Sequence, residues 1–378
     1  MRGRRALAAV LLTVGLAGCA SFPDNGPREW QEQLDGVGEL GGIPRVPESS
    51  GTPPTPPEAG GSPEAPLAPE PCDDPDPAVV ATCLDPLGAI AVLPGGTTAL
   101  VAERATGRVL RVERDVDPVV VTTVPVDASG GGGLTGLVLS PSYAEDRLVY
   151  AYATTPEDNR VLLLAPGEAP KPVLTGIPRG AEHNGGALAV DLDGSLLVAT
   201  GDAGGPGGPG STAGALLRID TRGRPAEGNP DPASPVLSSG LVDPGGVCVN
   251  PETQAVWVTD RTPEADVLHL VVPGPLPAPA WRWPDRPGVG GCAAVGDAVA
   301  VPQAGPEALF VLRTDPNALV TSTETALQDA YGRLGAATLA PDGLVWIGTE
   351  NKDGGTPVPT DDRAIRIPLA GGGGQSRA

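Results

Sequence analysis

The sequence predicts an all-β fold in which six repeated units close into a six-bladed β-propeller. Aromatic residues make up only 3% of the 378 residues, whereas glycine and proline number 54 and 46. This composition favours short strands and tight turns over helices. Six successive segments each hold three short apolar strands, at a spacing of about 45 to 60 residues that propeller blades allow. One such unit cannot bury both of its faces, whereas six units in a ring can. Two packed β-sandwich domains are the alternative interpretation.

Each unit starts with a small residue and an apolar strand, turns at proline, aspartate, glycine or asparagine, and continues through two more strands. From first to last predicted strand, the units span residues 88–112, 134–164, 187–220, 245–272, 290–312 and 335–367. Trp257 and Trp346 occupy equivalent second strands, so we expect both to pack between blades. No segment has a sustained helical period, although residues 321–331 could hold one short turn of helix.

The third unit carries the main candidate for chemistry. Its first strand, residues 187–191, turns at Asp193-Gly194 and returns through residues 195–200, which predicts a hairpin. His183 enters this hairpin and Asp202 leaves it, so both side chains should lie at one end of one sheet. An imidazole beside a carboxylate is held in one tautomer and becomes a better proton acceptor. A solvated turn histidine is the alternative interpretation.

The first 19 residues are typical of a lipoprotein signal peptide. Arginines at positions 2, 4 and 5 precede an apolar segment of residues 6–16, which is too short to span a bilayer. The segment ends in Leu-Ala-Gly-Cys19, which resembles a bacterial lipobox. Cleavage would leave Cys19 as the first residue, where it would carry the lipid. Two or three acyl chains on this residue would anchor the protein stably to a membrane. We therefore expect the protein on the extracytoplasmic face of the cell membrane. An ordinary secretory signal is the alternative.

The remaining chain divides into three parts. Residues 20–83 are rich in proline and glycine and predict a tether with an entry segment, residues 84–370 form the propeller, and residues 371–378 form a flexible tail. The formal net charge is −21, and the acidic residues are spread along the chain. This charge argues against binding to nucleic acid or electrostatic attraction to an anionic surface.

Four cysteines besides Cys19 allow three disulfide pairings in an oxidising compartment. We prefer Cys72–Cys83, which closes a short loop at the domain entrance, and Cys248–Cys292, which joins two neighbouring units. A metal site is a poor alternative because the cysteines form no C-x-x-C pair and have no neighbouring histidine.

Several stretches, in the same order, resemble the soluble glucose/sorbosone dehydrogenase family that depends on pyrroloquinoline quinone (PQQ). They are residues 133–137, 183–186 with 201–202, and 214–220, extended by 281–284 and 332–334. The resemblance covers residues 84–370. It implies a six-bladed propeller that binds PQQ and Ca²⁺ in its central cavity and oxidises aldoses or related sugars at the anomeric carbon.

The resemblance also implies roles for individual residues. His183 would take the hydroxyl proton of the sugar, and Asp202 would partner it. Arg333 would contact the cofactor, and Trp283 would either line the channel mouth or pack in the core. Backbone carbonyls at Thr262 and Pro263 would hold calcium, which requires no particular side chain.

The cations and amides that the family places around the quinone are missing here. Their positions fall on Gly131, Val242, Asp243, Gly245, residues 303–305 and Gly335. Each charge-assisted hydrogen bond contributes roughly 1.5–3 kcal/mol, so losing three or four would weaken PQQ binding by many orders of magnitude. Two functions stay open. One is a divergent binding or scaffolding protein of the cell envelope, with a sugar or other small ligand in its channel. The other is an active PQQ-dependent sugar dehydrogenase with His183 as general base.

Overall fold

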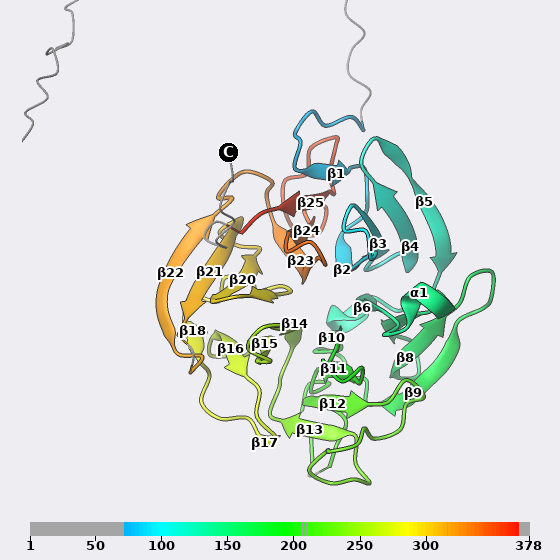
Figure 1. Cartoon of the computed structure of the whole chain (residues 1–378), viewed down its shortest axis with the longest axis vertical. Helices are drawn as coiled ribbons and strands as arrows, with labels where there is room; N and C mark the ends of the chain where they lie inside the picture. Colours follow the sequence, from blue (N-terminus) through cyan, green and yellow to red (C-terminus); the bar gives the residue numbers. More distant parts are fainter. Residues whose placement is uncertain (1–71, 206, 209, 316, 370–378) are drawn as a thin grey trace, which may run out of the picture. The chain divides into compact units, whose positions relative to one another are not determined.

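The computed structural model describes residues 72–205, 207–208, 210–315 and 317–369, and these residues form six small sheets around a central axis (Figure 1). The six-bladed propeller predicted from the repeats is therefore confirmed. Among these described residues, helix is limited to α1 (Tyr143–Asp146) and the 3₁₀ turn η1 (Ser129–Gly131). Within the described part of the chain, no helix has the length and apolar character needed to cross a membrane.

Each blade runs from an inner strand at the axis to an outer strand at the rim. The first two blades are β2 (Leu87–Val92), β3 (Thr98–Glu103), β4 (Arg108–Glu113) and β5 (Val116–Thr123), then β6 (Leu134–Leu139), β7 (Val149–Thr154), β8 (Asn159–Leu164) and β9 (Lys171–Ile177). The third is β10 (Gly186–Val190), β11 (Leu196–Thr200), β12 (Ala215–Ile219), β13 (Val236–Ser239) and β17 (Gly274–Pro275). The fourth is β14 (Pro244–Val249), β15 (Val256–Arg261), β16 (Asp266–Leu270) and β18 (Trp281–Trp283). The fifth is β19 (Ala293–Val295), β20 (Ala298–Gln303), β21 (Ala308–Thr314) and β22 (Val320–Ala326), and the sixth is β23 (Leu334–Leu339), β24 (Val345–Thr349), β25 (Ala364–Ile367) and β1 (Val79–Ala81).

The sixth blade joins the beginning of the propeller to its end. Strand β1 pairs antiparallel with β25, with Val79 opposite Ile365 and Ala81 opposite Ala364. Strand β1 lies within the segment 20–83 that the sequence predicts to be tether and entry, so the propeller starts before residue 84. Residues 1–71 and 370–378, which include the predicted signal peptide, Cys19 and the predicted tail, lie outside the described residues.

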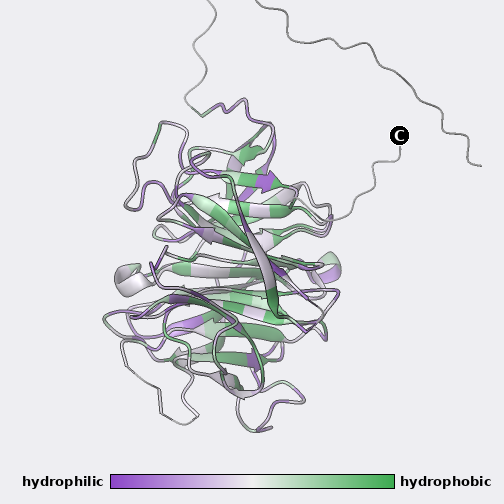
Figure 2. Ribbon diagram, turned by 90° about the vertical axis from the view of Figure 1, so that its left-hand side faces the viewer, coloured by the Kyte–Doolittle hydropathy of each residue, from purple (hydrophilic) through white to green (hydrophobic). Residues whose placement is uncertain are grey.

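The hydrophobic core lies between neighbouring blades. Figure 2 shows the hydrophobic residues concentrated in the strands. One cluster packs Val101 and Leu110 of the first blade against Trp346 of the sixth, and another places Trp257 beside Leu312 of the next blade. Both tryptophans are fully buried, as predicted. Side chains therefore fill the wedge between blades, which is what holds six weakly stable sheets in one ring.

The outer strands were the hardest elements to predict. Strand β5 is mostly exposed, and residues 320–326 form strand β22, where the sequence suggested a turn of helix. Strand β22 pairs with β21 along its length. Its sequence, Val-Thr-Ser-Thr-Glu-Thr-Ala, alternates β-branched residues, which favours a strand at a sheet edge. The prediction of a helical turn was wrong because an exposed edge strand buries no apolar face.

Both predicted disulfides are present. Cys72 and Cys83 are bonded with their Cα atoms 5.5 Å apart, and Cys248 and Cys292 are bonded with a Cα separation of 5.7 Å. The second bond links inner strand β14 to the residue just before β19, so it joins the fourth blade to the fifth at the axis.

We expect the double variant Cys248→Ala/Cys292→Ala to lose about 4 kcal/mol of unfolding free energy, because the bond closes a loop of 44 residues. The matched variant Cys72→Ala/Cys83→Ala, which opens a loop of 11 residues, should lose about 3 kcal/mol. Urea unfolding followed by tryptophan fluorescence measures both losses. An unchanged midpoint for the first variant would contradict the stabilising role of this bond.

Candidate functional site

His183 and Asp202 meet at the end of the hairpin β10–β11. The Nδ1 atom of His183 lies 2.8 Å from Oδ1 of Asp202. The side chain of His183 is 26% exposed, so one edge of the ring faces solvent. His183 adopts a φ of +54°, which is uncommon for a residue other than glycine and costs conformational energy. Such backbone strain clusters at functional sites. The predicted contact between His183 and Asp202 is therefore present, and its catalytic role remains a prediction.

The carboxylate fixes the tautomer of the histidine. An ionised carboxylate only accepts hydrogen bonds, so Nδ1 of His183 carries the proton and Nε2 has a free lone pair. The Oδ1 atom of Asp202 also accepts the amide N–H of Gly204 at 2.8 Å, which holds the carboxylate in place. No hydrogen bond reaches Nε2 from the described residues. Nε2 is therefore the atom that could accept a proton from a bound molecule.

The neighbouring Asn184 anchors this loop to the second blade. Its side chain is buried, and its Oδ1 atom accepts the amide of Gly180 at 2.8 Å. Its Nδ2 atom donates to the carbonyls of Gly130, at 3.2 Å, and Gly180, at 2.9 Å. The histidine is thus attached to a rigid support.

A second support reaches Asp202 through the segment before β14. The buried carboxylate of Asp260 accepts the amides of Val242 at 3.0 Å and of Asp243 at 2.7 Å. The carbonyl of Val242 in turn accepts the amide of Asp202 at 2.8 Å. Burial raises the pKa of Asp260 to about 6. Burial also lowers the pKa of His269, whose Nε2 lies 3.9 Å from Asp260, to about 4.

Glycines let the inner strands converge at the end of the channel where these strands start. A Cβ added to Gly290 would lie 2.0 Å from the carbonyl oxygen of Gly335, and one added to Gly88 would lie 2.2 Å from that of Leu134. Real Cβ atoms do not approach so closely, so only glycine fits at these crossings. The strand starts surround a small cavity of about 70 Å³, which glycines from all six blades line together with Arg104, Arg261 and Glu350.

Arg261 holds the aspartate that replaces a family amide. Its Nε atom donates to Oδ2 of Asp243 at 2.9 Å. The other oxygen, Oδ1 of Asp243, is buried without a hydrogen-bond partner, 3.0 Å from the position of a Cβ on Gly185. The charge of Asp243 is therefore balanced by a cation within its own blade.

Two more arginines flank Glu350. Nη2 of Arg333 donates to Oε1 of Glu350 at 3.2 Å, and Nη2 of Arg104 donates to Asp353. Burial raises the pKa of Glu350, while the charges of Arg333, Arg261 and Arg104 oppose the rise. Three guanidinium groups from the first, fourth and sixth blades therefore gather around one carboxylate. We call Arg104, Arg261 and Arg333 the axial arginines.

The sequence analysis identified Arg333 but missed Arg104, Arg261 and Glu350. A signal was available, since all three stand at the ends of second strands. Arg104 directly follows β3, Arg261 ends β15, and Glu350 directly follows β24. Second strands run toward the same end of the channel in every blade, so aligning the six units by strand would have grouped these residues.

Trp283 does not lie at the channel. It belongs to β18, the outermost strand of the fourth blade, and its side chain is buried. Its ring centroid lies 5.5 Å from that of Phe310 in the fifth blade and 6.4 Å from that of Trp281. The cofactor-binding role is therefore wrong, and the alternative of core packing holds. Wide gaps between outer strands require large side chains, which explains an aromatic cluster there.

The predicted calcium position lies in the turn after β15. The hydroxyl of Thr262 donates to the carbonyl of Ala265 at 2.7 Å, and the backbone amide of Thr262 donates to the same carbonyl at 3.0 Å. Across the described residues, no group of three or more histidine, cysteine, aspartate or glutamate side chains could hold a metal ion. A calcium site built on the carbonyls of Thr262 and Pro263 stays a prediction.

Comparisons with known proteins agree with this architecture. A family model described as Glucose / Sorbosone dehydrogenase matches residues 84–276. The PQQ-bound aldose sugar dehydrogenase of Streptomyces coelicolor is 32% identical, with a TM-score of 0.72 over 77% of this chain and 96% of that chain. A putative oxidoreductase (glucose dehydrogenase) of Thermus thermophilus is 31% identical, with a TM-score of 0.70 over 76% of this chain and 98% of that chain.

An uncharacterized protein of Synechocystis sp. is 31% identical in an alignment over 225 residues that covers 49% of this chain and 54% of that protein. This chain thus spans about half the length of that curated relative. Because the family model covers half of the chain, the class of protein is defined. The chain belongs to the glucose/sorbosone dehydrogenase family.

The shifted pKa values of the buried residues Asp260 and His269 predict that the unfolding free energy changes with pH in opposite directions when one or the other residue is replaced. Each unit of pKa shift corresponds to about 1.4 kcal/mol. The raised pKa of Asp260 gives stability that is present below pH 4 and is lost as the pH rises through about 6. The lowered pKa of His269 gives stability that is present above pH 6.5 and is lost as the pH falls through about 4.

In the unmodified protein the two effects offset each other. We expect His269→Gln to become less stable by about 2–3 kcal/mol as the pH rises from 4 to 6.5, and Asp260→Asn to become more stable by a similar amount. Urea unfolding of the three proteins at pH 4, 5, 6 and 7 measures these slopes. If the unfolding free energies of both variants changed with pH in the same way, the pKa values of Asp260 and His269 would not be shifted as stated.

Proposed function

We propose that this protein is a divergent ligand-binding member of the glucose/sorbosone dehydrogenase family that is anchored to the cell envelope and does not use PQQ. The observation that carries the proposal is the charge balance at the end of the channel where the axial arginines lie. Asp243 is paired with Arg261, and Glu350 is paired with Arg333, so the positive charge of each of these arginines is already balanced by one carboxylate of the chain. A tricarboxylate would have to compete with both.

The size and lining of this end also do not fit PQQ. The cavity beside the axial arginines has about 70 Å³, far below the roughly 300 Å³ at which pockets for small molecules begin. Val242 and Gly335 stand at two clamp positions and offer no charged or amide side chain. This end therefore lacks both the space and the number of charged or amide side chains that a three-ring quinone with three carboxylates requires.

A second candidate function is an active PQQ-dependent sugar dehydrogenase. It is favoured by the contact of 2.8 Å between His183 and Asp202 and by the likeness to a PQQ-bound aldose sugar dehydrogenase. PQQ, when bound, would supply the hydride acceptor. In this function Nε2 of His183 accepts the hydroxyl proton of the sugar, and Asp202 holds the ring in the required tautomer and stabilises the imidazolium that forms.

Titration of the purified mature protein with PQQ and Ca²⁺ separates the two functions. We expect no change in PQQ absorbance at micromolar concentrations and no reduction of an artificial electron acceptor by aldoses. The arginine of the exposed turn at Arg222 offers a control variant, Arg222→Gln. A spectral change with aldose-dependent dye reduction, lost in His183→Ala but kept in Arg222→Gln, would contradict the proposal and establish the dehydrogenase.

The proposed location rests on the lipobox-like sequence that ends at Cys19. We expect the protein in the membrane fraction of cells and labelled by radioactive palmitate. The variant Cys19→Ser should lose the label and leave the membrane fraction, because a lipid anchor requires the thiol. Equal membrane association and labelling of both proteins would exclude a lipid anchor at this position.

A further inference from the structure

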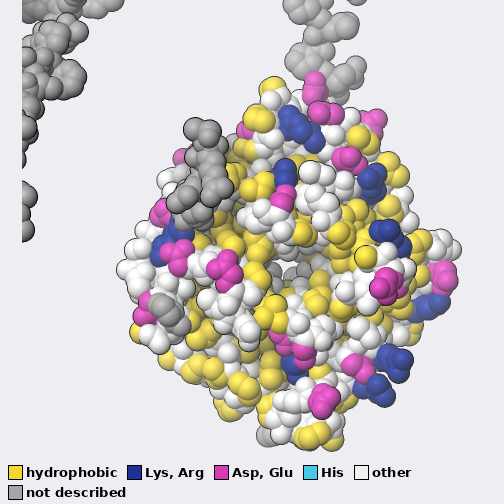
Figure 3. All heavy atoms as spheres, viewed as in Figure 1, with side chains coloured by type: hydrophobic (Ala, Val, Ile, Leu, Met, Phe, Trp, Pro, Cys, Tyr) yellow, Lys and Arg dark blue, Asp and Glu magenta, His cyan; other side chains and the backbone are white. Residues whose placement is uncertain are grey.

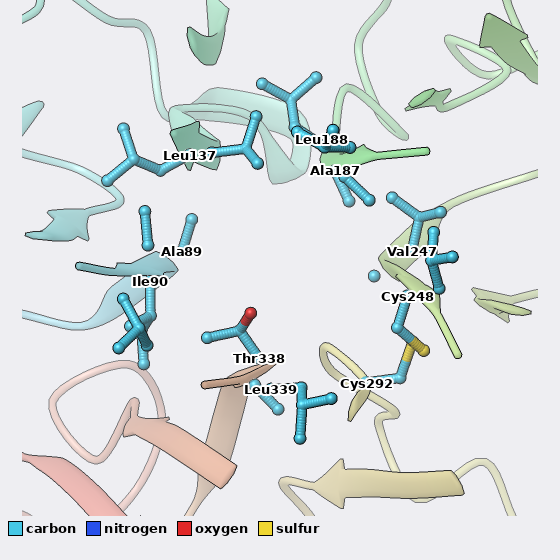
Figure 4. A pocket seen from close by; sticks show the side chains of 18 of the residues that line it. Ala89, Ile90, Leu137, Ala187, Leu188, Val247, Cys248, Cys292, Thr338 and Leu339 are labelled. Atoms are coloured by element: carbon cyan, nitrogen blue, oxygen red, sulfur yellow. A yellow bond between two sulfur atoms is a disulfide. The ribbon is translucent and has the colours of Figure 1, made fainter. Parts of the chain in front are cut away.

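The channel holds a second, much larger cavity below the axial arginines. It has a volume of about 620 Å³, and the inner strands of the blades line it. Figure 4 shows the side chains of Ile90, Leu137, Leu188, Val247 and Leu339 around the open space. Figure 3 shows hydrophobic atoms around the hollow at the axis. No charged and no aromatic residue is among the described lining residues.

This lining does not suit a sugar. A sugar ring needs hydrogen-bond partners for its hydroxyl groups, and an unpaired hydroxyl in an apolar site costs about 1–3 kcal/mol. The side chains here are mainly alanine, valine, leucine and isoleucine, with Thr338 as a polar exception labelled in Figure 4. An aliphatic chain gains free energy from such a wall, at about 0.8 kcal/mol for each CH₂ group that it buries.

The two cavities adjoin along the axis. Gly88, Thr135, Gly245 and Ala336 line both of them. Each of these residues belongs to the beginning of an inner strand, where the strand passes from the axial arginines to the apolar wall. One ligand could therefore reach from a charged end to an apolar interior.

The charged end has unused hydrogen-bond donors. The Nε atom of Arg261 is bonded to Asp243, whereas no described residue accepts a hydrogen bond from its Nη atoms. Arg261 lines the small cavity, so its free Nη donors can reach a molecule bound there.

The size of this end favours a small head group with a single charge. Each axial arginine has one carboxylate partner, Asp353 for Arg104, Asp243 for Arg261 and Glu350 for Arg333. A ligand with several negative charges would therefore meet repulsion, whereas one carboxylate can bind the free Nη atoms of Arg261. The small volume beside the arginines admits only a few atoms.

We propose that the channel binds a fatty acid, with the carboxylate against Arg261 and the aliphatic chain along the apolar cavity. This inference rests on the proposed function, since it names the class of ligand that the divergent channel holds. A guanidinium donates two parallel N–H bonds to a carboxylate, and charge-assisted bonds of this kind are the strong ones. The chain length then sets the affinity, and the head group sets the orientation.

Isothermal titration of the full mature protein with dodecanoate, dodecanol and acetate, below their micelle concentrations, tests the proposal. We expect saturable binding of dodecanoate, at least tenfold weaker binding of dodecanol, and no measurable binding of acetate. From octanoate to dodecanoate, each added CH₂ should tighten binding about fourfold. Saturable acetate binding as tight as that of dodecanoate, or no saturable dodecanoate binding, would overturn the proposal.

Two variants locate the head and the chain. Arg261→Gln should weaken dodecanoate binding at least tenfold and leave dodecanol binding unchanged, whereas the exposed control Arg222→Gln should change neither. Thr338→Trp fills the cavity and should abolish binding of both molecules. The control Thr323→Trp, on the exposed outer strand β22, should bind like the unmodified protein. Circular dichroism and thermal unfolding show whether each variant folds.

Equal effects of Arg261→Gln on dodecanoate and dodecanol would refute the proposed head-group contact. Unchanged binding to Thr338→Trp would refute the channel as the location of the chain. These titrations contain no quinone, so their failure leaves the PQQ result untouched. Conversely, tight PQQ binding would refute the proposed function without deciding where a fatty acid binds.

Discussion

The structure depends on the close approach of six inner strands at one end of the channel. Their backbones cross at distances that exclude a Cβ atom, as at Gly290 beside the carbonyl of Gly335. Glycine at the strand starts narrows this end, whereas the residues that follow in each strand carry aliphatic side chains and line a wider space. The same strand thus makes a polar, narrow end and an apolar, wide interior. The small polar cavity and the large apolar cavity both follow from this taper.

Much of the fold could be predicted because burial leaves a clear pattern in the sequence. The three inner strands of each blade are buried on both faces and appear as short apolar runs bounded by turns, as in residues 196–200 of β11. Outer strands such as β5 bury little and carry no comparable pattern. Strand β1 was also missed, because three residues in a proline-rich segment indicate a strand only when their partner, nearly 300 positions later, is known.

The site was predictable where it is local and not where it is assembled from distant blades. His183 and Asp202 flank one hairpin, so hairpin geometry alone brought them together. The cluster around Glu350 draws on the first, fourth and sixth blades, and no local pattern joins Arg104 to Arg261. Asp243 stands at a position where the sequence shows a family contact to be missing, and the sequence did not reveal that Arg261 balances its charge. For Trp283 the sequence left the channel mouth and the core open, and the residue packs in the core between two blades.

The pairing of β1 with β25 has a consequence for how the chain reaches its folded state. Strand β25 follows β1 by nearly 300 residues, so the circle cannot close until both strands and all the blades between them have been synthesised. Contacts between such distant residues form slowly, since long loops must first be ordered. Until then the sixth sheet lacks an edge partner. Any truncation that removes residues 364–367 would leave an open arc of blades with an unpaired strand, exposed to proteases and to other chains.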